Sequence, residues 1–182
     1  AQQHGHMEAV GYDLYMKLLS EAVTEEQGVK QEKARECSVD VAADAYLSKT
    51  YIPYAPQRME MYKKIARIAC EDDYDDMLDE LCDRFGEPAA PAVDLCRIAL
   101  IRALAASVGI TKVGERDGTV TFVCEEMNPA ASSALAKAFP QSRIRATLGS
   151  LPALTCRLPK GERATEFILS LLRCYGKAKA EA

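Results

Sequence analysis

The sequence predicts an α+β fold with an N-terminal helical arm, a helical middle, and a small antiparallel sheet with helices in the last third. Two observations lead to this prediction. Apolar residues recur every three or four positions through much of the first two thirds, which is typical of amphipathic helices. After Gly109 they alternate with polar residues in short runs divided by turn signals, which is typical of strands. With 182 residues, of which 48% are hydrophobic, the chain can bury its own core.

The first 36 residues are expected to form a helix followed by a linker. Residues 24–36 are polar and are interrupted by Gly28, so they predict a solvated linker. Residues 7–23 predict a helix whose large apolar face needs a packing partner or leads to self-association. That face is formed by residues at helical spacing: Met7, Val10, Leu14 and Leu18.

The middle of the chain predicts one short strand and three helices. Residues 37–42 alternate between apolar and polar side chains, which indicates a strand. Helices are expected over residues 57–70, 73–85 and 91–108. The second has an acidic first turn and stops at Gly86, as the helix dipole and glycine capping favour. The third is apolar on several sides and is expected to be the central buried helix.

The last third is expected to contain two strand pairs and two helices. Asp117 and Gly118 form a favoured hairpin dipeptide between the first two strands. Asn128 and Pro129 have the residue types of a helix cap and a first helical position. The expected elements are strands at 110–113 and 119–124, a helix from 129 to 139, strands at 143–148 and 153–158, and a helix at 162–175 with a frayed tail.

Composition disfavours several classes of protein. The net charge of −4 and the pI of about 5.3 make independent DNA binding unfavourable, because proteins that grip phosphates are usually basic. No apolar run is long enough to span a membrane, and no signal peptide pattern is present. The seven cysteines contain no CxxC pair, so they are expected to be reduced core residues, Cys82 and Cys96 in helices and Cys124 and Cys156 in strands.

The motifs of common catalytic and cofactor sites are missing from the sequence. It contains no P-loop, GxSxG, GxGxxG or HExxH segment, and its histidines are His4 and His6. We therefore expect no catalytic residue, metal site or cofactor in this chain. One helical face carries Glu80, Asp83 and Arg84, which form an exposed charged cluster. By itself this spacing indicates an ordinary ion pair within the helix.

Several segments together resemble the bacterial transcription-repair coupling factors. Residues 2–15, QQHGHMEAVGYDLY, are similar to the segment that closes the family's helicase motor, in a motif shared with the branch-migration helicase RecG. Four further segments follow in the family's order and spacing: Asp44-Ala45-Tyr46, Tyr51-Ile52-Pro53, RMEMYKKIA at 58–66 and ELCDRFG at 80–86. The resemblance covers residues 1 to about 124.

The resemblance implies the C-terminal regulatory module of a cytoplasmic, ATP-dependent DNA translocase of nucleotide excision repair. The ATPase motor, with its ATP and Mg²⁺, would precede residue 1. Family members act on stalled RNA polymerase and duplex DNA and recruit UvrA. Their C-terminal domain docks on an N-terminal UvrB-like domain of the same protein, masks the UvrA-binding surface and restrains the motor.

The resemblance also assigns residues and boundaries. Residues 1–36 would be the end of the translocation motif with its helix and linker, and residues 37–182 the regulatory domain. In the motif remnant, His4 stands where the family has serine. The resemblance assigns Gln3, Gly5 and His6 to that remnant, and Glu80, Asp83 and Arg84 to the interdomain contact.

The alternative is a small independent DNA-binding protein or enzyme. A deep pocket with converging polar groups would indicate an enzyme. A basic stripe would indicate DNA binding. The sequence offers one candidate stripe in the last third, made of Arg143, Arg145, Arg157, Lys160 and Arg163.

Overall fold

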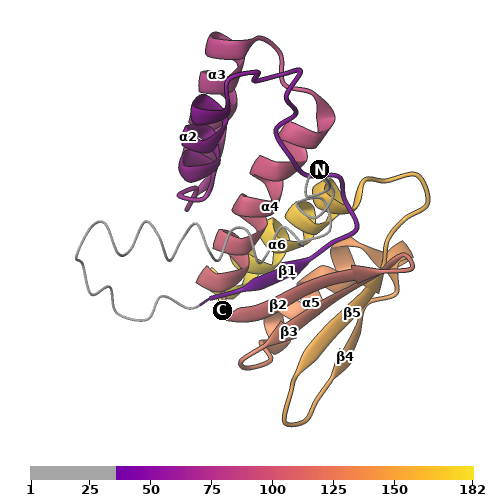
Figure 1. Cartoon of the computed structure of the whole chain (residues 1–182). Helices are drawn as coiled ribbons and strands as arrows, with labels where there is room; N and C mark the ends of the chain where they lie inside the picture. The colour runs from indigo at the N-terminus through magenta and orange to yellow at the C-terminus, as the bar shows by residue number, and fades with distance from the viewer. Residues whose placement is uncertain (1–35) are drawn as a thin grey trace.

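The computed structural model describes residues 36–182, and within this range the chain forms five α-helices and a five-stranded sheet. Figure 1 shows α4 and α6 packed on one side of the sheet, with α2 and α3 beyond the end of α4 that points away from it. The α+β fold class is confirmed. The elements are β1 (Ser38–Asp40), α2 (Ala55–Ile65), α3 (Glu71–Phe85), α4 (Ala90–Ser107), β2 (Ile110–Arg116), β3 (Thr119–Cys124), α5 (Pro129–Ala138), a 3-10 turn (Pro140–Ser142), β4 (Arg145–Thr147), β5 (Ala153–Arg157) and α6 (Ala164–Ala180).

The sheet has the strand order β1-β2-β3-β5-β4. The pairs β2–β3, β3–β5 and β5–β4 are antiparallel, as the sequence predicts for the last third. β1 joins this sheet by pairing with β2 in parallel, and Val39 lies opposite Val113. Both valines are buried, so β1 contributes to the same hydrophobic core.

The turn between β2 and β3 has the conformation that its sequence favours. Asp117 and Gly118 have φ angles of 52° and 72°. Positive φ at both central residues defines the type I′ turn, which matches the twist of a hairpin. The amide of Gly118 also donates a hydrogen bond of 2.9 Å to the Glu115 carboxylate. The predicted hairpin is therefore confirmed.

The core lies between the sheet and its helices. Side chains alternate between the two faces of a strand. On the inner face Val120, Phe122 and Leu154 are buried. α4 packs against β1 and β2 from this side, and Leu95 and Ile101 on it have no exposed surface. The prediction of a central buried helix is confirmed.

A polar cluster joins α4 to the start of α6. The carboxylate of Asp94 accepts a hydrogen bond from the Thr165 hydroxyl at 2.7 Å and one from Arg97 at 3.1 Å. Arg163 approaches its other oxygen at 3.4 Å. Arg97 also forms an ion pair with Glu166 at 2.8 Å. These contacts fix the first turn of α6 on α4.

Two helix C-terminal ends differ from the sequence prediction by five residues, and the other helix ends by at most two. α2 ends at Ile65 instead of residue 70, because the amides of Arg67 and Ile68 bond back to carbonyls three residues earlier and form a tight turn. This turn buries Ile68 in the core. α6 continues to Ala180 instead of fraying after residue 175. The Lys179 ammonium donates a 2.7 Å hydrogen bond to the carbonyl of Val108, which secures this last turn.

Candidate docking surface on α2 and α3

α3 has one apolar face and one acidic face. Its side chains Tyr74, Met77 and Leu81 are buried against the rest of the domain. The acidic face points to solvent and consists of exposed aspartates: Asp72, Asp73, Asp75, Asp76, Asp79 and Asp83. A surface of this charge favours a basic partner.

Four charged side chains form a closed ring between α2 and α3. Lys64 donates to Glu80 at 2.6 Å, and Arg84 donates to the same carboxylate oxygen at 2.7 Å. On the other side of the ring, Glu60 lies 3.0 Å from Arg84 and 3.4 Å from Lys64. Each charge therefore has two neighbours of opposite sign. We call Glu60, Lys64, Glu80 and Arg84 the charged ring.

The charged ring holds all four groups in their ionised forms. The hydrogen bond from Lys64, followed by that from Arg84, lowers the pKa of Glu80. The hydrogen bond from Arg84 is likewise the main cause that lowers the pKa of Glu60. Conversely, the hydrogen bond to Glu80 raises the pKa of Lys64, and bonds to Glu60 and Glu80 raise that of Arg84.

The C-terminal end of α3 is fixed in place, which positions the charged ring. The helix stops at Gly86, whose φ of 83° strongly favours glycine. The hydroxyl of Tyr51 lies 2.8 Å from the carbonyl of Gly86 and 3.1 Å from that of Leu81, so it satisfies the end of the helix. The Arg84 guanidinium lies 5.1 Å from the ring centre of Phe85, a cation–π distance.

The structure brings together two of the three predicted docking residues. Glu80 and Arg84 share the charged ring, and their side chains are 30% and 32% exposed, so neither is buried in the core. Asp83 is exposed on the same helix, outside the ring. Sequence reasoning missed Glu60 and Lys64. Their four-residue spacing on one helix was visible, but nothing in the sequence indicated that α2 lies against α3.

The other predicted residues have different outcomes. Gln3, Gly5 and His6 lie outside the described residues. Within residues 36–182, no three His, Cys, Asp or Glu side chains gather so that they could hold a metal ion. None of the helices in this part of the chain is long and apolar enough to cross a membrane.

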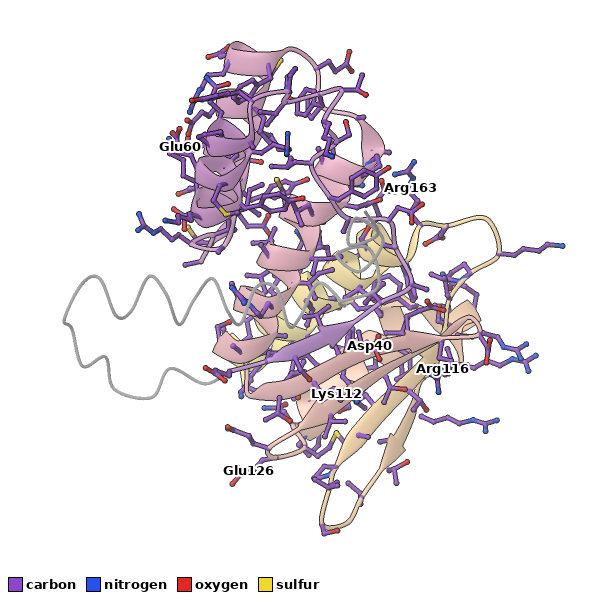
Figure 2. The ribbon with its side chains drawn as sticks, in the orientation of Figure 1. Asp40, Glu60, Lys112, Arg116, Glu126 and Arg163 are labelled. Atoms are coloured by element: carbon purple, nitrogen blue, oxygen red, sulfur yellow. The ribbon has the colours of Figure 1, made fainter. Side chains whose placement is uncertain are left out.

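The candidate basic stripe is divided in the structure. Arg143, Arg145 and Arg157 line one shallow hollow on the sheet. Arg163 instead faces Asp94 at the start of α6, and Figure 2 shows it well away from Arg116 at the far end of the β2–β3 hairpin. The prediction of one continuous stripe is therefore wrong, because residues 160–163 turn away from β5 toward α4.

Comparison with known proteins gives consistent matches. The transcription-repair-coupling factor of Staphylococcus haemolyticus (strain JCSC1435) is 34% identical over 134 residues, which are 70% of this chain and 12% of that protein. That of Staphylococcus epidermidis (strain ATCC 12228 / FDA PCI 1200) is 28% identical over 186 residues, 98% of this chain and 16% of the relative. The chain thus spans about a sixth or less of the length of these relatives.

A solved structure and a family model agree with these matches. The crystal structure of the C-terminal domain of a transcription-repair coupling factor has the same fold, with a TM-score of 0.66 and 24% identity, over 81% of this chain and 94% of that one. The family model of the TRCF domain matches residues 41–135, which are more than half of the 182 residues. This chain therefore belongs to the TRCF domain family.

Proposed function

We propose that this chain is the C-terminal regulatory module of a cytoplasmic transcription-repair coupling factor. In this proposal the surface of α3 around Glu80, Asp83 and Arg84 docks on an N-terminal UvrB-like domain of the same protein. Docking masks the UvrA-binding surface and restrains the ATPase motor until the module is released. The ATP and Mg²⁺ of the motor, and its contacts with RNA polymerase and duplex DNA, would belong to other parts of the longer protein.

One observation supports this proposal most directly. The charged ring keeps Glu80 and Arg84 at the surface in fixed positions, with Asp83 exposed beside them. A docking site with fixed side chains loses less conformational entropy when the partner binds. Exposed ion pairs also contribute only about 0.2–1 kcal/mol each, so an interface built from them can be released by a competing partner. Both properties suit a reversible autoinhibitory contact.

Family membership supports the coarser part of the proposal. The relatives are named for coupling transcription to repair, and the matched crystal structure is of their C-terminal domain. We infer a role in transcription-coupled repair from these names. We also infer that the chain has no catalytic site of its own, and that Gln3, Gly5 and His6 belong to the end of the translocation motif.

The test uses the full-length protein and a charge reversal at Asp83. Asp83 is the suitable position because it lies outside the charged ring, so Asp83→Lys leaves the α2–α3 contacts intact. We expect this variant to capture UvrA several-fold more strongly and to hydrolyse ATP faster without a partner, because repulsion opens the closed state. Pull-down and a phosphate-release assay measure the two effects.

The matched control is Asp72→Lys, which makes the same charge change in the first turn of the same helix. We expect it to leave UvrA capture and basal ATP hydrolysis close to those of the parent protein. If Asp83→Lys also leaves both unchanged, or if Asp72→Lys has the same effect, docking through the C-terminal end of α3 is wrong.

A further inference from the structure

The face of the sheet opposite α4 carries an excess of positive charge, and we propose that it binds the phosphate backbone of duplex DNA. This inference goes beyond the proposed docking role, which concerns α3. Only the choice of DNA over RNA rests on the proposed role in repair. We call this surface the open sheet face, because none of the helices in residues 36–182 packs on it.

The strand registers determine which side chains belong to this face. Alternation along each strand sends the buried residues toward α4 and their neighbours outward. The outward residues of the four antiparallel strands are basic, hydroxylated, small or, at one position, aliphatic, and none is acidic. They are Lys112, Gly114, Arg116, Thr119, Thr121, Val123, Ala153, Thr155, Arg157, Arg145 and Thr147.

The cations on this face are spaced so that they can contact separate phosphates. Arg116 pairs with Thr119, which pairs with Arg157, so the two arginines are two strands or about 10 Å apart. Lys112 lies four residues before Arg116 on β2, about 13 Å along the strand. Arg145 lies opposite Thr155, diagonally across from Arg157. A duplex carries about one negative charge per 1.7 Å of its axis, so each cation can meet its own phosphate.

A shallow hollow at one end of this face gathers a fifth cation. Arg143 lines it together with Arg145, Arg157 and the side chains of Thr119 and Thr155. Arginine and threonine side chains are common hydrogen-bond donors to phosphate oxygens. Within residues 36–182 none of the ion pairs involves these three exposed arginines, so their charge is not neutralised by the domain itself.

A carboxylate on the edge strand β1 borders the open sheet face. Asp40 on β1 lies opposite Gly114, between the positions of Lys112 and Arg116, and Figure 2 shows these three along the neighbouring strands β1 and β2. It lies at the edge strand, away from the hollow. The negative charge of Asp40 repels phosphate, so a variant that removes this charge is expected to bind DNA more tightly.

The residue types favour a duplex over a single strand. Proteins that bind single strands stack bases on aromatic side chains. The outward strand residues include no aromatic, and Phe122 points into the core. The open sheet face can therefore contact the backbone but not the bases. The expected binding is independent of sequence, with a Kd on the order of 10⁻⁶–10⁻⁴ M at physiological salt.

The test measures the salt dependence of DNA binding by the 182-residue chain. Fluorescence anisotropy with a labelled 20-base-pair duplex, titrated between about 25 and 200 mM KCl, gives the slope of log K against log salt. Five phosphate contacts predict a slope of about −4.5. The triple variant Arg116→Gln, Arg145→Gln, Arg157→Gln should reduce it to about −1.8 and weaken binding at least tenfold at low salt. Asp40→Asn should tighten binding.

The matched control removes the same number of charges from exposed positions outside the sheet, in the turn after α2 and on α5 and α6, through Arg67→Gln, Lys137→Gln and Lys177→Gln. We expect this control to retain the parent slope, with both triple variants folded by circular dichroism. An equal loss in the control overturns the proposal. So does tighter binding to single-stranded DNA, to duplex RNA, or to polyglutamate than to duplex DNA. Asp83→Lys should leave the salt dependence of DNA binding unchanged. The docking proposal and the DNA-binding proposal can therefore fail independently.

Discussion

Asp94 is the charged residue that is buried within residues 36–182. Burying a carboxylate costs free energy unless hydrogen bonds and opposite charges replace water. Asp94 receives both, from the hydroxyl of Thr165 and from the guanidinium groups of Arg97 and Arg163. Thr165 is 1% exposed and its hydroxyl donates to Asp94, so it depends on Asp94 in turn. The contact between Asp94 and Thr165 therefore fixes the start of α6 against α4.

Removal of this hydroxyl should destabilise the fold. Thr165→Val keeps the shape of the side chain and removes the donor to a buried carboxylate. We expect a loss of about 1.5–3 kcal/mol in the free energy of unfolding, measured by urea denaturation. Thr121→Val makes the same substitution on the half-buried outer side of β3 and should be nearly neutral. Equal losses in the two variants would show that the Asp94 contact contributes nothing specific.

At the scale of elements, α2 and α3 are joined both by apolar packing and by the charged ring. Met61 and Ile65 of α2 and Leu81 of α3 have no exposed surface. At the surface next to these residues, two ion pairs of the ring cross between the helices, Lys64–Glu80 and Arg84–Glu60, and one further pair lies within each helix. The pKa shifts of the ring make this junction sensitive to acid.

The direction of that sensitivity follows from the two glutamates. Glu60 and Glu80 have lowered pKa values in the folded state, so the unfolded state binds their protons more readily. Their contribution is therefore present above the pKa of an unfolded glutamate, about 4.3, and is lost as pH falls through the folded values. The double variant Glu60→Gln, Glu80→Gln should have a lower Tm near neutral pH and a smaller decrease in Tm between about pH 6 and pH 3.

Thermal melts across this pH range measure the effect. The control Glu87→Gln, Glu126→Gln removes two exposed carboxylates that form no ion pair within the described part of the chain. Its profile should follow that of the parent chain. The ring makes no contribution to acid sensitivity if the two double variants give the same profile.

Local signals in the sequence were sufficient for many elements. Asn128 was predicted to start a helix, and its side chain accepts the Ala131 amide at 2.8 Å. Gly86 was predicted to end α3, and it does so with positive φ. The features that the sequence did not predict depend on contacts between residues far apart in the chain. The last turn of α6 relies on Val108, which follows the end of α4, and the ring requires α2 beside α3, so neither could be derived from spacing along the chain.

At the scale of the whole molecule, the cysteines are distributed according to the layers of the fold. All seven are free. The prediction that they lie in the core is confirmed for Cys37, Cys96, Cys124 and Cys156. It is wrong for Cys70 and Cys82, which are exposed at the start and on the outer side of α3, because no further element covers them within residues 36–182.

This distribution predicts the thiol reactivity of the folded chain. Burial raises the pKa of Cys96 to about 12 and that of Cys156 to about 11, so neither forms the reactive thiolate near neutral pH. Labelling with a maleimide at about pH 7.5 should modify Cys70 and Cys82 rapidly, and the buried thiols only after unfolding in urea. Mass spectrometry of the labelled chain locates the sites. Rapid labelling of Cys96 under native conditions would contradict the buried placement of α4.

The two proposed surfaces lie on different parts of the molecule. Figure 1 shows α3 beyond the end of α4 that points away from the sheet, whereas β2 and β3 lie in the sheet on which α4 packs. A partner on α3 therefore need not cover the open sheet face. If both proposals hold, release from the UvrB-like domain and contact with DNA can occur independently in the same protein.

The parallel pairing of β1 has a consequence for the route by which the chain folds. Val39 and Val113 are neighbours in the sheet, yet three helices separate them in the chain, whereas β2 and β3 are joined by a two-residue turn. Closing a long loop costs more conformational entropy than forming a hairpin, which takes only about 1–10 μs. The entropic cost of closure therefore favours early formation of the β2–β3 hairpin and late addition of β1, once the helices between them have shortened the gap.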